Sequence, residues 1–264
     1  MRKLGVPAPI ALLALASLFG DEGNQDKEAW PDLTVPSQLA KVIDLATPAE
    51  KLPVSTKDSQ SLVHFPDRST PYNGWSKKMH ANGKIEDLVH YKDGKRDGPW
   101  GRWYDNGQCQ YQFLMQEGKM MVGKGWKPNG DASPTRIIDG NGLCVGYHSN
   151  GRKRFEGMRV KGELEGIVSV WYGNGSPYWQ RRYRQGKANG PAKEWVSSSS
   201  RVISVSGGTQ RIPMNPGKLR KIEGYYKNGL RDGEWLEFDD QGNPMFRTTY
   251  RTGSVVKRLS ALGD

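Results

Sequence analysis

Residues 91–107 read YKDGKRDGPWGRWYDNG, and residues 226–238 read YKNGLRDGEWLEF. In each stretch an Asp-Gly or Asn-Gly dipeptide is followed by a second glycine four residues later, and then by two aromatic residues three apart. Both dipeptides accept positive φ, which the tight turn of a β-hairpin requires. The two stretches therefore predict hairpins, and the return of the same order much later in the chain predicts a structural repeat.

Turn signals of this kind recur along most of the chain. Nine Asn-Gly dipeptides begin at positions 73, 82, 106, 129, 141, 150, 174, 189 and 228, and each predicts a hairpin turn. The turn glycines that we predict to be structural are Gly83, Gly107, Gly130, Gly151, Gly175 and Gly229. The first five are separated by 24, 23, 21 and 24 residues, and another glycine follows each of them after 10 or 11 residues. Each period therefore contains two turns and about two strands.

Aromatic residues keep a constant position within this period. Four residues before the turn stand Trp103, Trp126, Tyr147, Trp171 and Phe238, and Trp195 keeps the same register. A glycine also stands nine residues before many turns, where we expect its bare backbone to lie beneath a neighbouring ring. Trp100 and Trp103 are three apart, so either a bulge separates them or both faces of the sheet carry aromatic residues.

Turn, glycine and aromatic residue together resemble the variant MORN repeat, Y-x-N-G-K-x-D-G-x-W-x-x-Y, known from bacterial YwqK-like antitoxins. The resemblance covers residues 71–258 in about seven units. It implies an all-β fold, a single-layer antiparallel meander of tandem β-hairpins. Strand-length segments between closely spaced turn signals, with no long helical periodicity, predict the same fold independently.

The segments outside the repeats have a different composition. Residues 1–20 place Arg2 and Lys3 before an apolar run, with acidic residues directly after it. This order predicts a signal peptide and an exported protein (periplasmic, cell-surface or extracellular), with an uncleaved membrane anchor as the alternative.

Two irregular segments remain. Residues 21–70 are expected to form a linker with one short helix over 37–46, capped by Ser37 and docked on the first hairpins, with Leu39, Val42, Ile43 and Leu45 on one side. Residues 197–217 interrupt the repeat array and predict a long loop or an irregular hairpin.

Charge is concentrated in the C-terminal half of the chain. The protein has a formal net charge of +11, and residues 151–258 contain 21 Lys and Arg against 10 Asp and Glu. The candidate binding residues are the basic runs together with the repeat tryptophans: Arg152, Lys153, Arg154, Arg181, Arg182, Arg184, Trp103, Trp126, Trp171 and Trp195. In regular register the basic runs could form one stripe, which is either a solvated face or a docking surface for an anionic partner. Export disfavours nucleic acid as that partner.

No motif for catalysis, a metal or a cofactor stands out. His80 and His148 share one repeat position and are expected to be polar strand residues, while Asp97 and Asp232 are expected to form turns. Cys109 and Cys144 should lie about three strands apart, too far for a disulfide, and remain free thiols.

Three hypotheses for function follow. The first is a non-enzymatic binding or scaffold protein that presents its sheet to a protein or an anionic envelope component. The alternative, implied by the YwqK resemblance, is an antitoxin or immunity protein that binds a toxin directly. The third is an enzyme acting on envelope polymers, which would require a pair of carboxylates in a groove.

Overall fold

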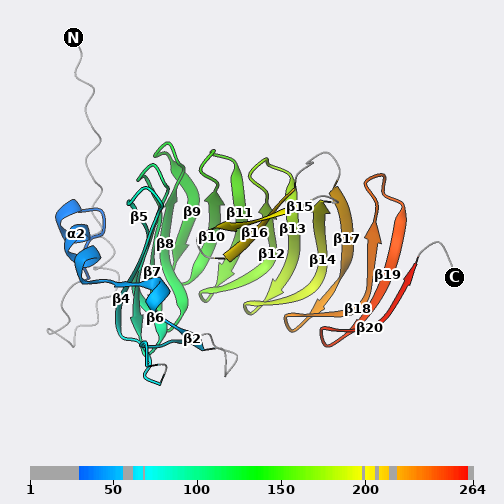
Figure 1. Ribbon diagram of the computed structural model, residues 1–264, viewed down its shortest axis with the longest axis horizontal. Helices are drawn as coiled ribbons and strands as arrows, with labels where there is room; N and C mark the ends of the chain where they lie inside the picture. The colour runs from blue at the N-terminus through cyan, green and yellow to red at the C-terminus, as the bar shows by residue number, and fades with distance from the viewer. Residues whose placement is uncertain are drawn as a thin grey trace, which may run out of the picture.

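The computed structural model describes residues 30–55, 62–67, 69–197, 200–205, 208–213 and 219–260, so the expected signal peptide lies outside the described residues. The described chain forms one 16-stranded open sheet in the order β1-β4-β5-β6-β7-β8-β9-β10-β11-β12-β13-β14-β17-β18-β19-β20 (Figure 1). From β4 onward every neighbouring pair is antiparallel. The predicted all-β meander of hairpins is therefore confirmed.

The long strands of the sheet follow one another in chain order. They are β4 (Gly74–Met79), β5 (Ile85–Lys92), β6 (Lys95–Trp103), β7 (Cys109–Gln116), β8 (Lys119–Trp126), β9 (Ala132–Ile138), β10 (Asn141–Tyr147), β11 (Lys153–Val160), β12 (Glu163–Trp171), β13 (Pro177–Arg184), β14 (Lys187–Ser197), β17 (Leu219–Lys227), β18 (Leu230–Phe238), β19 (Pro244–Arg251) and β20 (Ser254–Ser260).

The insertion between β14 and β17 forms a hairpin of its own. Its strands, β15 (Ser200–Val205) and β16 (Gly208–Pro213), pair in regular antiparallel register as a separate two-stranded sheet. β14 pairs directly with β17, so the large sheet continues past the insertion without a gap.

The N-terminal edge of the sheet is covered. β1 (Thr47–Pro48) pairs in parallel with β4, and the Lys77 ammonium donates to the Ile43 carbonyl at 2.7 Å. Next in the chain come η2 (Ala49–Lys51) and a small sheet of β2 (Val54–Ser55) and β3 (Leu62–Val63). Among the described residues, no helix has the length and hydropathy needed to cross a bilayer.

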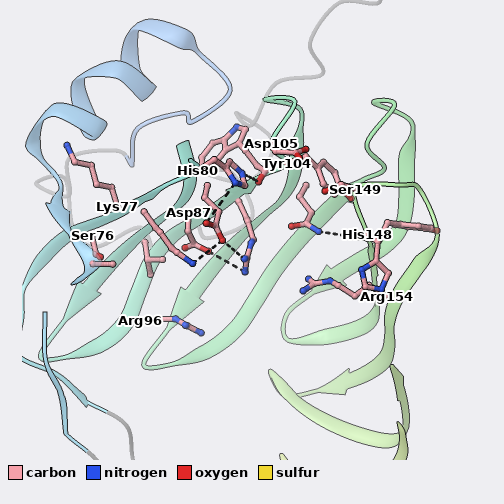
Figure 2. A pocket seen from close by; sticks show the side chains of 18 of the residues that line it. Ser76, Lys77, His80, Asp87, Arg96, Tyr104, Asp105, His148, Ser149 and Arg154 are labelled. Atoms are coloured by element: carbon pink, nitrogen blue, oxygen red, sulfur yellow. Dashed lines mark hydrogen bonds and ion pairs between the residues drawn. The ribbon is translucent and has the colours of Figure 1, made fainter. Parts of the chain in front are cut away.

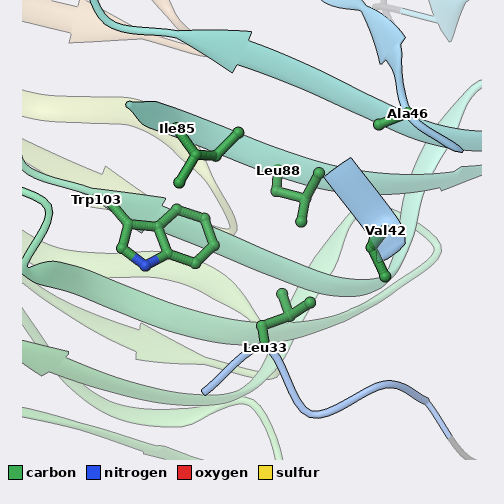
Figure 3. Close-up of a cluster of buried hydrophobic side chains, with 6 residues drawn as sticks. All are labelled: Leu33, Val42, Ala46, Ile85, Leu88 and Trp103. Atoms are coloured by element: carbon green, nitrogen blue, oxygen red, sulfur yellow. The ribbon is translucent and has the colours of Figure 1, made fainter. Parts of the chain in front are cut away.

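The predicted short helix is α2 (Pro36–Leu45), and it packs on the first strands. Val42 and Ala46 join a buried cluster with Leu33 and with Ile85, Leu88 and Trp103 of the sheet (Figure 3). One end of the sheet therefore has two layers.

Two details of the predicted helix are wrong. Val35 rather than Ser37 precedes the first turn, because Pro36 occupies the first helical position, where its missing N–H costs nothing. Leu45 is 79% exposed, since it lies at the C-terminal end and points away from the sheet.

We call the face against which α2 packs the outer face, and the opposite face the inner face. The inner face is concave between β6 and β11. The Gln110 side-chain amide on β7 donates to the Tyr147 carbonyl on β10 at 2.9 Å, although a flat sheet would separate these strands by about 14 Å. One buried cluster on this face therefore draws on six strands: Trp100, Tyr111, Phe113, Met115, Met120, Ile137, Cys144 and Phe155.

Glycines at register shifts bend the sheet, and one of them, Gly98, lies in this concave part. Gly98, Gly166, Gly190 and Gly233 have φ of 94°, 75°, 129° and 70° at positions where pairing with the neighbouring strand shifts. Such bulges bend a strand and increase its twist. The sequence pattern predicts that an aromatic ring covers the glycine nine residues before the turn. This prediction is wrong at Gly166 and Gly233, where an added Cβ would meet nothing within 4 Å.

The two series of turns lie at opposite ends of the strands and have different conformations. At one end both central residues have positive φ, as at Asp93-Gly94 and Asn228-Gly229. At the other end only the glycine has positive φ, as Gly83 does. There the chain reverses over more residues, and the Gly83 amide donates to the His80 carbonyl. Three of the nine Asn-Gly dipeptides are not turns, since Gly74, Gly142 and Gly190 lie in β4, β10 and β14.

Candidate functional site

The repeat aromatic residues form one row on the outer face. Trp103 lies in the α2 cluster, and alternation along each strand places its equivalents on the same side. We call this set the aromatic row: Trp103, Trp126, Tyr147, Trp171, Trp195 and Phe238. Trp103 is buried beneath α2, whereas the other five are half-buried. Trp100 lies in the inner cluster, so both faces carry aromatic residues.

Small or basic residues separate the members of the row. Cys109 pairs with Trp103, Ala132 with Trp126, Lys153 with Tyr147, and Lys221 with Trp195. The Lys153 ammonium lies 5.3 Å from the ring centroid of Trp171, and the Lys221 ammonium lies 4.6 Å from that of Phe238. Beyond β10 the row is therefore both aromatic and basic.

The side chain three residues before the turn glycine forms a hydrogen bond that links its repeat to the next one. His80 and His148 each place Nε2 about 3 Å from a carbonyl oxygen of the row, at Trp103 (3.0 Å) and Trp171 (2.9 Å). The hydroxyls of Tyr104 and Tyr172 donate to the equivalent carbonyls of Trp126 and Trp195, both at 2.9 Å. His80 and His148 lie just beyond the ends of β4 and β10, so the prediction that they are strand residues is wrong, although both are polar residues that serve the repeat.

The predicted basic stripe does not form. Gly157 of β11 and Arg181 of β13 stand at the same position along the strand direction. Arg152, Lys153 and Arg154 precede Gly157 and therefore lie nearer to the turn than Arg181 does. Neighbouring residues also alternate between faces, because the side-chain period of a strand is two. The six basic residues are therefore dispersed.

Each basic residue has its own surroundings. Arg152 donates to the Asn174 carbonyl, and Lys153 forms an ion pair with Glu156. Arg182 and Arg184 are exposed. Arg181 lies on the inner face, where it donates to Glu194 at 2.7 Å and stacks on Trp179 at 4.6 Å. Only part of the predicted set is thus available on the outer face.

An apolar patch lies on the outer face, further along the strands than the aromatic row, with Glu156 and Ser169 between them. Ile138, Met158 and Ile167 are 41%, 46% and 61% exposed, on β9, β11 and β12. Half-buried Leu143 on β10 pairs with Met158, while Ile167 pairs with Arg182. We call Ile138, Leu143, Met158 and Ile167 the apolar patch. Exposed apolar side chains gathered on one face are typical of a protein interface, and here Met158 pairs with Glu165 as Ile167 does with Arg182.

The inner face contains a groove of about 730 Å³ at the end of the strands where the turns contain Gly83, Gly107 and Gly151. Figure 2 shows Arg154 extending into it from one side, opposite His80 and Asp87. Glu86, Gln110 and Arg154 line it and share one repeat position, three residues after the turn glycine. Each is the extra residue of a bulge.

Most charges in the groove are paired. Arg102 lies 2.7 Å from Glu86 and 3.7 Å from Asp87, and the Lys78 ammonium lies 3.2 Å from Glu86. Burial raises the pKa of Asp87, an effect that Arg102 and the Trp100 indole oppose. Burial and the nearby Arg102 both lower the pKa of Arg154. The groove therefore combines an ion-paired network around Glu86 with cationic side chains outside it, among them Arg154.

The prediction that Asp97 and Asp232 form turns is wrong, because they lie within β6 and β18, and each binds the next hairpin turn instead. The Asp97 carboxylate accepts from the Glu117 amide at 3.0 Å, and that of Asp232 accepts from the Thr252 amide at 3.4 Å. Within the described ranges, no group of three or more His, Cys, Asp or Glu is placed to hold a metal ion.

Sequence reasoning missed the groove and its residues Glu86, Arg102 and Gln110. The repeat alignment contains the signal, because Glu86, Gln110 and Arg154 occupy the same position in three units. What the alignment lacks is the curvature that brings β5, β7 and β11 together. No family model matches this chain, and no curated protein matches it.

Proposed function

We propose that this protein is a non-enzymatic binding or scaffold protein that holds an acidic protein partner on the outer face of its sheet. One observation carries the proposal: beyond the part under α2, the aromatic row is half-buried, and the same face carries an exposed apolar patch. An exposed isoleucine on a sheet face costs solubility without contributing to stability, which favours a role in association.

The charges around this surface favour an acidic partner. Lys153 and Lys221 lie over rings of the row, and exposed Arg182 adjoins Ile167 of the patch. Basic residues at the rim of an apolar surface attract an acidic partner and fix its register. An antitoxin or immunity protein would bind its toxin through the same face, so the same variants test that alternative. Export stays a prediction from residues 1–20.

Capture of partners from the native source tests the proposal. Ile167→Asp places a carboxylate in the patch without touching a buried side chain, because Ile167 is 61% exposed. We expect wild type to retain a stoichiometric acidic protein that Ile167→Asp loses. The matched control is Val256→Asp on β20, whose side chain is 57% exposed and lies far along the sheet. Equal capture by both variants contradicts the proposal.

A second arm separates a protein from an anionic envelope surface. Co-sedimentation with anionic vesicles that weakens as salt rises, and that Arg182→Ser with Arg184→Ser abolishes, would favour the envelope surface. Arg181 is left intact in this variant because it forms an ion pair with Glu194. We expect no such co-sedimentation.

A further inference from the structure

Arg154 lacks the carboxylate partner that Arg102 and Lys78 have in the inner groove. Its Nε is buried, and among the described residues no atom accepts a hydrogen bond from it. No described carboxylate lies within 4 Å of its guanidinium. Arg102, its neighbour in the groove, has both Glu86 and Asp87 within that distance. A buried guanidinium N–H without an acceptor is costly, and an anionic ligand that reaches Arg154 would offset that cost.

The backbone leaves room for this guanidinium. A Cβ added to Gly146 would lie 3.7 Å from Arg154 Nη2, so the side chain of Arg154 rests over the bare backbone of β10. From there it extends into the groove, as Figure 2 shows. Its position three residues after a turn glycine, at a bulge, holds it on the inner face while Lys153 lies on the outer one.

The other groups around the groove are polar and varied. His148, whose Nε2 is engaged by the Trp171 carbonyl, lines the groove together with His80 and Ser149. The groove volume of about 730 Å³ exceeds what a bare inorganic ion needs and falls within the range of sites for small organic molecules. Hydroxyl, imidazole and amide groups around a guanidinium suit a ligand that has both hydroxyls and an acid group.

We propose that the inner groove binds a sugar-sized organic anion whose carboxylate or phosphate group pairs with Arg154. The planar guanidinium matches either oxyanion in a two-point contact, while the polar rim binds the hydroxyls. This site lies on the face opposite to the proposed protein-binding surface and does not depend on it.

Calorimetric titration of the full chain at low salt tests the proposal with glucuronate, glucose 6-phosphate and uncharged glucose. We expect at least one of the two anions to bind and glucose not to bind, and the stronger anion identifies the acid group. Arg154→Gln should weaken that binding at least tenfold, because it removes a charge-assisted contact. Arg152→Gln, two residues earlier and exposed, should change it less than twofold.

A second measurement does not depend on which sugar is chosen. Sulfate should raise the melting temperature of wild type by a few degrees relative to chloride at matched ionic strength, and it should not raise that of Arg154→Gln. Without added anion, Arg154→Gln should be at least as stable as wild type, because an unpaired buried charge is removed. Equal binding by the Arg154 and Arg152 variants, or equal sulfate protection of wild type and Arg154→Gln, overturns the proposal.

Discussion

His148 Nε2 lies 2.9 Å from the carbonyl oxygen of Trp171 in the next repeat and therefore donates to it. Burial lowers the pKa of His148, nearby Arg154 adds to this effect, and the hydrogen bond opposes it. The unfolded chain consequently binds the proton more readily than the folded one. Stability should fall as the pH drops through the unfolded value of 6.5 and continue to fall to the folded pKa.

His148→Tyr separates the hydrogen bond from the titration. Tyr104 and Tyr172 occupy the same repeat position and donate to the equivalent carbonyls, so tyrosine should preserve the contact. We expect unchanged thermal stability at pH 7.5 and a smaller loss than wild type between pH 7.5 and 5.5. His148→Phe should lose about 1 kcal/mol at pH 7.5. Equal acid sensitivity of His148→Tyr and wild type would contradict this account.

Glu194 should be among the most sensitive polar positions. Its carboxylate accepts from Arg181 at 2.7 Å, from Arg231, and from the Tyr226 hydroxyl at 3.0 Å, and it is 8% exposed. Glu194→Gln leaves two guanidinium groups without a counter-charge, so we expect a loss of about 3 kcal/mol in urea denaturation. Glu223→Gln, which removes more exposed pairs with Lys193 and Lys221, should cost under about 1 kcal/mol. Similar losses at both positions would be inconsistent with a specific role for the Glu194 cluster.

Gly224 supports the aromatic ring of Trp235, which is only 2% exposed. A Cβ at position 224 would lie 2.2 Å from the indole, so Gly224→Ala must displace the ring. We expect a loss of about 2 kcal/mol or more in thermal denaturation and a change in tryptophan fluorescence. Gly146→Ala is the control, because its nearest neighbours would lie at 3.7 Å and its effect should stay near zero. A neutral Gly224→Ala would show that the ring has room to move.

Cys109 and Cys144 are free thiols on β7 and β10, three strand steps apart. Burial raises the pKa of Cys109 to about 12 and also raises that of Cys144. Because the thiolate is the reactive form, we expect neither to be alkylated in the native protein at pH 8 and both to be alkylated in urea. The alkylated mass should be the same with and without reductant. A pair that only reductant exposes to alkylation would show that the two strands lie much closer than the sheet register places them.

Local sequence pattern predicted the β-hairpin architecture. Gly83, Gly107, Gly130, Gly151, Gly175 and Gly229 all have positive φ, because turn conformation depends on a few adjacent residues. The same pattern misled at Asn73-Gly74, where positive φ at Gly74 serves a strand. A dipeptide reports which conformations a residue tolerates, and pairing with the neighbouring strand decides which one it adopts.

The candidate sites required the tertiary structure. The sequence placed the tryptophans at one repeat position and thereby determined that they share a face, since equivalent residues of equivalent strands point to the same side of the sheet. Only the folded sheet decided that Arg154 lies near Arg102. The two residues are five strands apart in the sheet, and the curvature that successive bulges produce brings them together. Each bulge adds a bend that is small by itself, and the direction in which the bends accumulate depends on the packing of side chains from six strands on the inner face.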